Sequence, residues 1–160
     1  GPGLPAGKIV EQQVLTEDIA PSVLEICGAP AIERTHGRSW KPLCTAGAPD
    51  WRTAWLYEYN YEKQFPYTPN IRGIRTDRFK FVRYPHGDGS PDRHLPEMYD
   101  LANDPDERNN LAADPAHAAT RADLERRLSE MLASFGLTPE KDTMPLDEGI
   151  KSELPAQKIR

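Results

Sequence analysis

The sequence has few cysteines and no long hydrophobic run. Its 160 residues contain two cysteines, Cys27 and Cys44, which are too few for a disulfide scaffold. No window approaches the roughly 18 apolar residues of a membrane span, so no membrane partner is expected. The net charge of −5 argues against nucleic acid as a partner, because phosphate binding needs clustered Lys and Arg.

The familiar motifs of catalysis and metal binding are also missing. The four histidines, His36, His86, His94 and His117, form no i, i+4 pair, and none neighbours a cysteine at ligand spacing. No G-x-S-x-G, P-loop or G-x-G-x-x-G sequence is present. We therefore assign no catalytic residue and no metal ligand to this chain.

An acidic run in the second half admits two interpretations. Asp100, Asp104, Asp106 and Glu107 could attract a cation, but their spacing lacks the glycine of an EF-hand loop. Capping explains them better, because Asp104 can accept from the following N–H groups and Pro105 fits a first helical turn. We expect a capped turn here.

The first 50 residues predict one short strand and one helix. The strand is expected over Lys8–Leu15, and the helix over Asp18–Gly28, where Asp18 can cap the start and Gly28 can end it in the left-handed conformation. One apolar face of this helix is formed by Ile19, Val23, Ile26 and Cys27. We therefore expect Cys27 to be a buried free thiol rather than the partner of Cys44 in a disulfide.

A composition change at 47–50 marks a domain boundary, and a small antiparallel sheet is predicted after it. Four β-prone stretches follow one another at 52–59, 71–76, 79–84 and 97–101. No helical crossover separates them, so neighbouring strands should pair antiparallel.

A helix after Asp114-Pro115 should cover this sheet. Its single apolar stripe comprises Leu124, Leu128, Met131, Leu132 and Phe135, and Gly136 ends it. A helix with one apolar stripe must bury it, and the sheet is the available partner. The fold class is therefore α+β, with about four antiparallel strands packed against one C-terminal helix.

The predicted hairpin carries an unusual number of cations. Arg72, Arg75, Arg78, Lys80 and Arg83 could bind sulfate, phosphate or carboxylate groups, for which guanidinium forks are suited. The same residues could equally form ordinary salt bridges. The neighbouring aromatic loop at 57–67 could stack on sugar rings or serve as a packing lid.

Several segments, in this order, resemble the sulfatase family. They are the Gly/Pro turn at 1–7, E-D-I-A-P-S-V-L-E-I-C-G at 17–28, H-G-R-S at 36–39, R-T-D-R-F-K-F at 75–81 and M-Y-D-L-A-N-D-P-D-E-R-N-N-L at 98–111. The resemblance covers residues 1–137 and is most similar to bacterial N-acetylglucosamine-6-sulfatases and arylsulfatases. It implies that residues 1–50 end a large catalytic α/β domain, that 51–137 form the C-terminal subdomain, and that 138–160 are an extended tail.

The resemblance implies a sulfuric ester hydrolase whose reacting groups lie outside this chain. Family members carry a C/S-x-P-x-R motif matured to formylglycine, together with calcium ligands, in the N-terminal domain. Neither Cys27 nor Cys44 stands in such a motif, so we expect the 160-residue chain alone to be inactive. Formylglycine, calcium and the N-terminal domain itself are expected in the remainder of the enzyme.

The expected role of this chain is to form one wall of a cleft for a sulfated glycan or aryl sulfate. Glu58, Tyr59, Tyr61 and Arg72 are the candidate substrate-binding residues. Two alternatives remain: a non-catalytic glycan-binding or interaction module, and a phosphonate or phosphate ester hydrolase of the same alkaline phosphatase-like superfamily. Many such sulfatases are exported, so a periplasmic or extracellular location is an expectation of the resemblance, although the sequence itself indicates no compartment.

Overall fold

The computed structural model describes residues 3–60, 69–85 and 95–142. The chain divides into two compact units, residues 1–53 and 54–160. This division lies close to the boundary expected after residue 50, and it places Trp51 and Arg52 with the first unit. Tyr61 and most of the expected tail lie outside the described residues. Within the described part, no helix is long and apolar enough to cross a membrane.

The first unit contains helices α1 (Ile19–Cys27) and α2 (Lys41–Cys44), with a 3₁₀ turn at Thr16–Asp18 before α1. Helix α1 was predicted, and Gly28 ends it with φ 68° as expected for a left-handed cap. The strand expected over Lys8–Leu15 is wrong, because this segment is not paired with another strand. A β-strand needs a hydrogen-bonding partner, and the described part of this unit offers none.

The apolar face of α1 is open within the first unit. Ile19 and Val23 are 53% and 49% exposed, and Cys27 is exposed as well. The prediction of a buried Cys27 thiol is therefore wrong, because burial of this face needs a covering element that residues 3–53 do not supply. Both cysteines are free thiols, as predicted.

A buried carboxylate organises the first unit instead of capping α1. Asp18 makes no capping bond to the helix; its Oδ1 accepts from the backbone N–H of Arg38 (2.7 Å) and its Oδ2 from that of Leu15 (2.8 Å). The Arg52 guanidinium binds both carboxylate oxygens. Burial alone raises the pKa of the Asp18 carboxyl, but these hydrogen bonds outweigh it and hold the pKa below its ordinary value.

The H-G-R-S segment has a steric reason to contain glycine. A Cβ on Gly37 would lie 2.0 Å from the backbone oxygen of Glu17, so only glycine lets this loop approach the turn before α1. The approach places the Arg38 N–H against Asp18. Nearby, the guanidinium groups of Arg38 and Arg52 both lie over the Trp51 ring, at 5.0 and 4.8 Å from its centroid.

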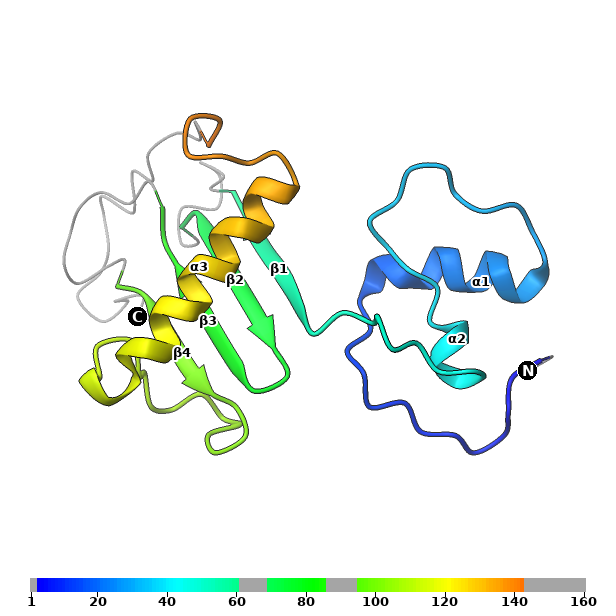
Figure 1. The fold of residues 1–160 in the computed structure, drawn as a ribbon, viewed down its shortest axis with the longest axis horizontal. Helices are drawn as coiled ribbons and strands as arrows, with labels where there is room; N and C mark the ends of the chain where they lie inside the picture. The colour runs from blue at the N-terminus through cyan, green and yellow to red at the C-terminus, as the bar shows by residue number, and fades with distance from the viewer. Residues whose placement is uncertain (1–2, 61–68, 86–94, 143–160) are drawn as a thin grey trace, which may run out of the picture. The chain divides into compact units, whose positions relative to one another are not determined.

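The second unit is a four-stranded antiparallel sheet in the order β1-β2-β3-β4 (Figure 1). The strands are β1 (Ala54–Tyr59), β2 (Ile71–Thr76), β3 (Phe79–Arg83) and β4 (Glu97–Asp100). They lie in sequence order, as expected for strands joined without crossovers. The predicted antiparallel sheet is confirmed.

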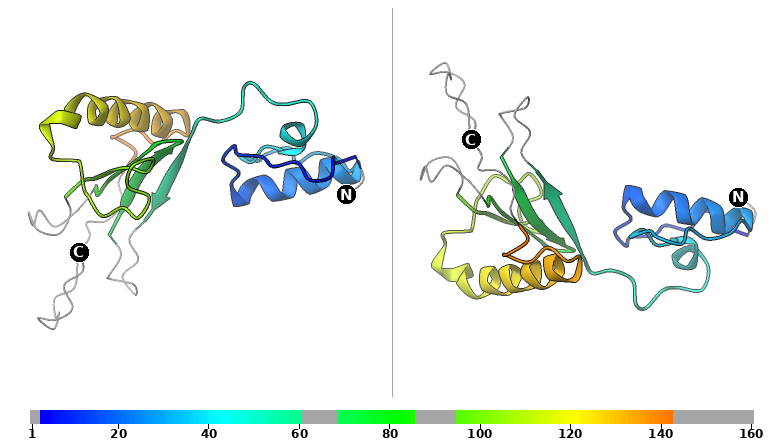
Figure 2. Two further views of the ribbon diagram at one scale, coloured as in Figure 1. Left: turned by 90° about the horizontal axis from the view of Figure 1, so that it is seen from below. Right: turned by 90° about the horizontal axis from the view of Figure 1, so that it is seen from above.

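Helix α3 (Ala118–Ser134) lies along one face of this sheet (Figure 2). Leu124, Leu128 and Leu132 pack there in one core, against the strand residues Ile74, Phe81 and Met98. The predicted α+β arrangement is therefore confirmed. Phe135, expected in the same stripe, is 51% exposed, because α3 ends before it and the chain turns at Gly136 (φ 82°), so that Leu137 packs on the core instead.

The acidic run after β4 is a turn, as predicted. The Asp104 carboxylate accepts from the backbone N–H groups of Arg108 (3.1 Å) and Asn109 (2.8 Å). Asp100 is buried and binds Arg78 through two hydrogen bonds of 2.9 and 2.6 Å, which lower the pKa of the Asp100 carboxyl far below its ordinary value. These contacts explain the aspartates of the M-Y-D-L-A-N-D-P sequence by structure rather than by metal binding.

Candidate functional site

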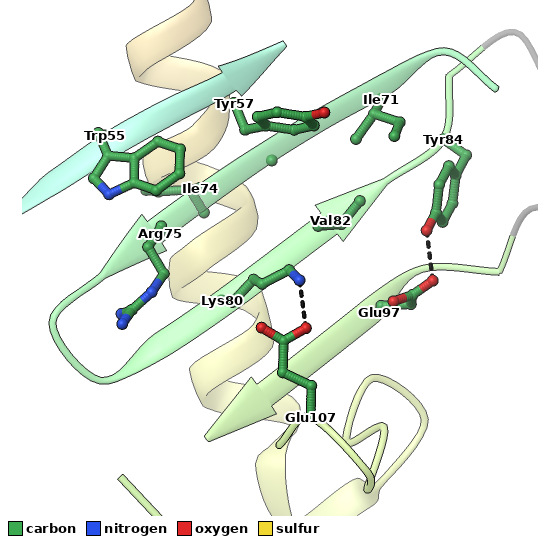
Figure 3. A pocket seen from close by; sticks show the side chains of 11 residues that line it. Trp55, Tyr57, Ile71, Ile74, Arg75, Lys80, Val82, Tyr84, Glu97 and Glu107 are labelled. Carbon is green, nitrogen blue, oxygen red and sulfur yellow. Dashed lines mark hydrogen bonds and ion pairs between the residues drawn. The ribbon is translucent and has the colours of Figure 1, made fainter. Parts of the chain in front are cut away.

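The sheet face opposite α3 contains a groove of about 420 Å³. Strand alternation determines which residues reach it. In register across the first three strands, Trp55, Arg75 and Lys80 form one row, and Tyr57, Gly73 and Val82 form the next. Figure 3 shows these side chains on the face of the sheet away from the helix.

The floor of the groove is closely packed at Gly73 and leaves no room for a side chain there. A Cβ at this position would lie 3.2 Å from the backbone oxygen of Phe81 and 3.3 Å from Cγ2 of Val82, which is tighter than ordinary packing. The rings of Trp55 and Tyr57 stand on the neighbouring strand β1 (Figure 3). An apolar floor beside aromatic rings is an arrangement that can stack on the apolar face of a sugar ring.

An ion pair borders the groove on the β3 side. Lys80 Nζ lies 2.5 Å from Oε2 of Glu107 and 5.6 Å from the centroid of the Tyr99 ring. Glu107 is a non-glycine residue with φ 55°, a left-handed conformation that L-residues seldom adopt. The turn held by Asp104 fixes this conformation and so presents the carboxylate to Lys80.

Glu97 joins two tyrosines at the other end of the groove. Its Oε1 accepts from the Tyr84 hydroxyl at 2.5 Å and its Oε2 from the Tyr99 hydroxyl at 3.0 Å. Burial, followed by the hydrogen bond to Glu97, raises the pKa of Tyr99 to about 12 and the pKa of Tyr84 further. Both phenols are therefore neutral hydrogen-bond donors at physiological pH, and Glu97 is their shared acceptor.

The predicted substrate-binding residues are not gathered in this groove. Glu58 and Arg72 pair directly across β1 and β2, while Tyr59 pairs with Ile71. Because side chains alternate between faces, Glu58 and Arg72 lie on the α3 side of the sheet and Tyr59 on the opposite side. Tyr61 lies outside the described residues.

Arg72 connects three segments of the second unit. Its Nη1 donates to the backbone oxygens of Tyr59 (3.1 Å) and Ile71 (2.9 Å), and its Nη2 donates to Oδ1 of Asp142 (2.9 Å). The side chain is 0% exposed, and Oε1 of Glu58 lies 3.9 Å from Nη2. These contacts show a structural function for Arg72; its binding of substrate stays a prediction.

Sequence reasoning did not select Tyr84, Glu97 or Glu107 as site residues. Alternation along β3 and β4 would have placed Glu97 on the face of Lys80 and Val82, but the contribution of Glu107 depends on a turn that brings residues 27 positions apart together. Only the tertiary structure shows that contact.

The described residues do not fit a calcium site. They contain no group of three or more His, Cys, Asp or Glu side chains that could hold a metal ion. The carboxylates of the acidic run are bound to Arg78, to backbone N–H groups and to Lys80. We assign no calcium ligand to this part of the chain.

Comparison with known proteins defines the class of this domain. Residues 2–134 match the family model "N-sulphoglucosamine sulphohydrolase, C-terminal", and the four-stranded sheet with its helix is the fold of a sulfatase C-terminal domain. The chain belongs to this family of sulfatase C-terminal domains.

Individual relatives agree with that assignment. The multifunctional alkaline phosphatase superfamily protein PehA of Trinickia caryophylli is 32% identical over 135 residues, which are 76% of this chain and 25% of that protein. A protein solved in complex with its substrate, D-glucosamine-2-N,6-O-disulfate, superposes with a TM-score of 0.63 at 28% identity, covering 79% of this chain and 25% of that one.

A phosphonate monoester hydrolase from Silicibacter pomeroyi superposes with a TM-score of 0.65 at 26% identity, covering 83% of this chain and 28% of that one. The chain thus spans about a quarter of the length of the relatives it matches.

Proposed function

We propose that this chain acts as the C-terminal part of a sulfuric ester hydrolase for sulfated glycans. The family match over residues 2–134 is the observation that supports this function most strongly. In this proposal the formylglycine nucleophile and the calcium ion belong to the larger N-terminal domain. The present chain then supplies stability and one wall of the substrate cleft.

The open sheet face is the part of the chain suited to that wall. It combines the rings of Trp55 and Tyr57 with the Lys80–Glu107 pair and the Glu97 carboxylate around one groove. Aromatic rings bind the apolar face of a sugar, while fixed charges and hydroxyl groups bind its polar edge. A glucosamine sulfate unit presents both kinds of surface.

The exposed face of α1 is suited to the second task. Ile19 and Val23 are large apolar residues open to solvent within the first unit, and an apolar patch of this kind marks a contact surface. We propose that the N-terminal sulfatase domain covers it. The partner is therefore the remainder of the enzyme.

A pair of assays tests the proposed function. The 160-residue chain should hydrolyse neither an aryl sulfate nor N-acetylglucosamine 6-sulfate, with or without calcium. A longer protein that joins this chain to an upstream domain with a C/S-x-P-x-R motif should release sulfate from the glycan. Turnover by the short chain would contradict the placement of the chemistry elsewhere, and an inactive longer protein carrying matured formylglycine would contradict the sulfatase assignment.

Hydrolysis of phosphonate monoesters is the second candidate function. The similarity to the Silicibacter pomeroyi enzyme favours it, because sulfate and phosphonate esters present similar tetrahedral oxyanions to a binding site. The same longer protein should be assayed with a phosphonate monoester at equal concentration. A higher kcat/KM for the phosphonate than for the sulfate ester would replace the first proposal with this one.

A further inference from the structure

A second pocket, of about 390 Å³, lies at the end of β3 beside the segment that follows α3. It is lined by Arg83, Tyr84, Pro85, Ser129, Leu132, Leu137, Thr138, Pro139 and Asp142. Leucine and proline side chains form much of its wall, and polar groups converge from β3, α3 and the following turn. Its size is within the range of small-molecule sites, and Tyr84 is the one lining residue that it shares with the groove on the open face of the sheet.

Arg83 is the unusual member of this pocket. Its Nε is buried without a hydrogen-bond partner, and no described carboxylate lies within ion-pair distance of its guanidinium group. Native structures pair nearly all such buried donors, so an exception needs an explanation. A guanidinium group with spare donors is suited to a planar or tetrahedral oxyanion.

The carboxylates near Arg83 are bound to its neighbour, Arg72. Arg72 pairs directly with Arg83 across β2 and β3, so the two cations lie side by side on one face, where like charges repel. Arg72 is already bound to Asp142 at 2.9 Å and has Glu58 at 3.9 Å. Both carboxylates contact Arg72, and neither makes an ion pair with the Arg83 guanidinium group.

Two other polar groups of the pocket are already engaged. The Ser129 hydroxyl donates to the backbone oxygen of Glu125 at 2.9 Å. The Asp142 carboxylate would repel an anion, but its Oδ1 is bound by Arg72. The unpartnered group at this pocket is therefore a donor, Arg83 Nε, and an acceptor ligand would pair with the guanidinium group.

We propose that this pocket binds an oxyanion, a sulfate or carboxylate group on a sugar-sized body, with Arg83 as its cationic ligand. The apolar wall formed by Leu132, Leu137 and Pro139 would contact the body that bears the charge. This site goes beyond the proposed hydrolase function and does not depend on it, because it needs neither formylglycine nor calcium.

The binding test uses the 160-residue chain and NMR detection of the arginine Nε–H resonances. The probes are sodium sulfate, N-acetylglucosamine 6-sulfate, glucuronate and uncharged N-acetylglucosamine. We expect at least one of the anionic probes to shift the Arg83 resonance saturably, while N-acetylglucosamine does not. Binding of the sulfate ester identifies the source as a sulfated sugar, and binding of glucuronate alone identifies it as a uronate.

Variants make the result specific to Arg83. Arg83→Gln should weaken the binding at least tenfold, and Arg83→Lys should weaken it several-fold because it keeps the charge and loses the fork. Ser129→Leu should block the pocket while leaving Arg83 in place. Arg126→Gln, which removes an exposed arginine paired with Asp123 and Glu130 on α3, should change nothing.

Three outcomes would overturn the proposal. The first is that none of the anionic probes binds saturably. The second is that the wild type and Arg83→Gln bind equally well. The third is that the charged and uncharged sugars bind equally well. An inactive longer enzyme would leave this result unaffected, so failure of the hydrolase assay and failure of this site are distinguishable.

Discussion

The two compact units of the chain are stabilised in opposite ways. In residues 3–53 the most buried side chains include the polar residues Asp18 and Ser22, and the apolar face of α1 is open. In the second unit Ile74, Phe81 and Met98 form an apolar core with α3. The first unit therefore depends on the polar centre at Asp18, whereas the second depends on an apolar core of its own.

This difference indicates how each unit relates to the rest of a sulfatase. A small unit with an open apolar face buries too little surface to be stable without a partner. A sheet covered by a helix buries a core on its own. The first unit is thus suited to completion by a larger domain, and the second is suited to autonomous folding.

The largest expected effect is the loss of the polar centre. Asp18→Ala should destabilise the first unit by about 4 kcal/mol, because it leaves Arg52 and two backbone N–H groups without their acceptor. Amide hydrogen exchange at Leu15 and Arg38 should accelerate accordingly. Glu17→Ala, at the adjacent exposed carboxylate, is the control and should have little effect. Unchanged exchange in Asp18→Ala would refute the polar centre.

The apolar core should give the next largest effect. Leu128→Ala should destabilise the second unit by about 3 kcal/mol, because the buried side chain leaves a cavity beneath α3. Urea denaturation followed by the circular dichroism of the helix measures this loss. Leu95 is 60% exposed, so Leu95→Ala is the matched control and should change stability by less than about 0.5 kcal/mol. Equal effects of both substitutions would contradict the assigned core.

Acidification should distinguish the two carboxylate centres. The pKa values of Asp18 and Asp100 are lowered in the folded chain. Their contributions are therefore complete above the unfolded-state pKa of about 3.9 and decline as the pH falls toward the folded-state pKa.

Asp18→Asn should remove this acid dependence from amide exchange in the first unit, and Asp100→Asn should remove it from exchange at Ala102 and Asn103 in the second. If either substitution removes the acid dependence of amide exchange in both units, the two carboxylate centres are not independent.

The smallest expected effect on stability concerns the groove. Glu97→Gln removes the charge and keeps a single acceptor oxygen, so one of the two tyrosine hydroxyls loses its acceptor and stability should fall by about 1 kcal/mol. The pKa of Tyr99 should fall from about 12 toward the ordinary value of about 10. Carbon-13 NMR of the tyrosine Cζ atoms against pH measures this fall, with the exposed Tyr57 as the internal reference. An unchanged pKa would show that Glu97 does not act on Tyr99.

Local patterns in the sequence predicted much of the second unit. Alternating residues and turn signals located the strands, and the leucines of α3 indicated the buried face. Phe135 was misassigned because periodicity alone does not specify the last helical residue, whereas the left-handed turn at Gly136 redirects the chain. Glu107 could not be assigned to the groove, because Lys80 lies 27 positions away in the sequence and the contact depends on the turn held by Asp104.

The first unit was harder to predict because its contacts are polar and distant in sequence. Asp18 was expected to cap α1, an interaction of neighbouring residues, but it binds Arg38 and Arg52 instead. The strand expected over Lys8–Leu15 failed because a strand depends on a partner outside its own sequence. The predicted set Glu58, Tyr59 and Arg72 was similarly divided between the two faces of the sheet by strand alternation.

The sequence by itself determined the family, the strand order and the face of α3 that is buried, because these depend on motifs and on local periodicity. The tertiary structure decided which charged side chains meet: Asp18 with Arg52, Lys80 with Glu107, and Arg72 with Asp142, while Arg83 has no counterion among the described residues. Ion pairs form between atoms a few ångströms apart, and only the folded chain brings together residues so distant in the sequence.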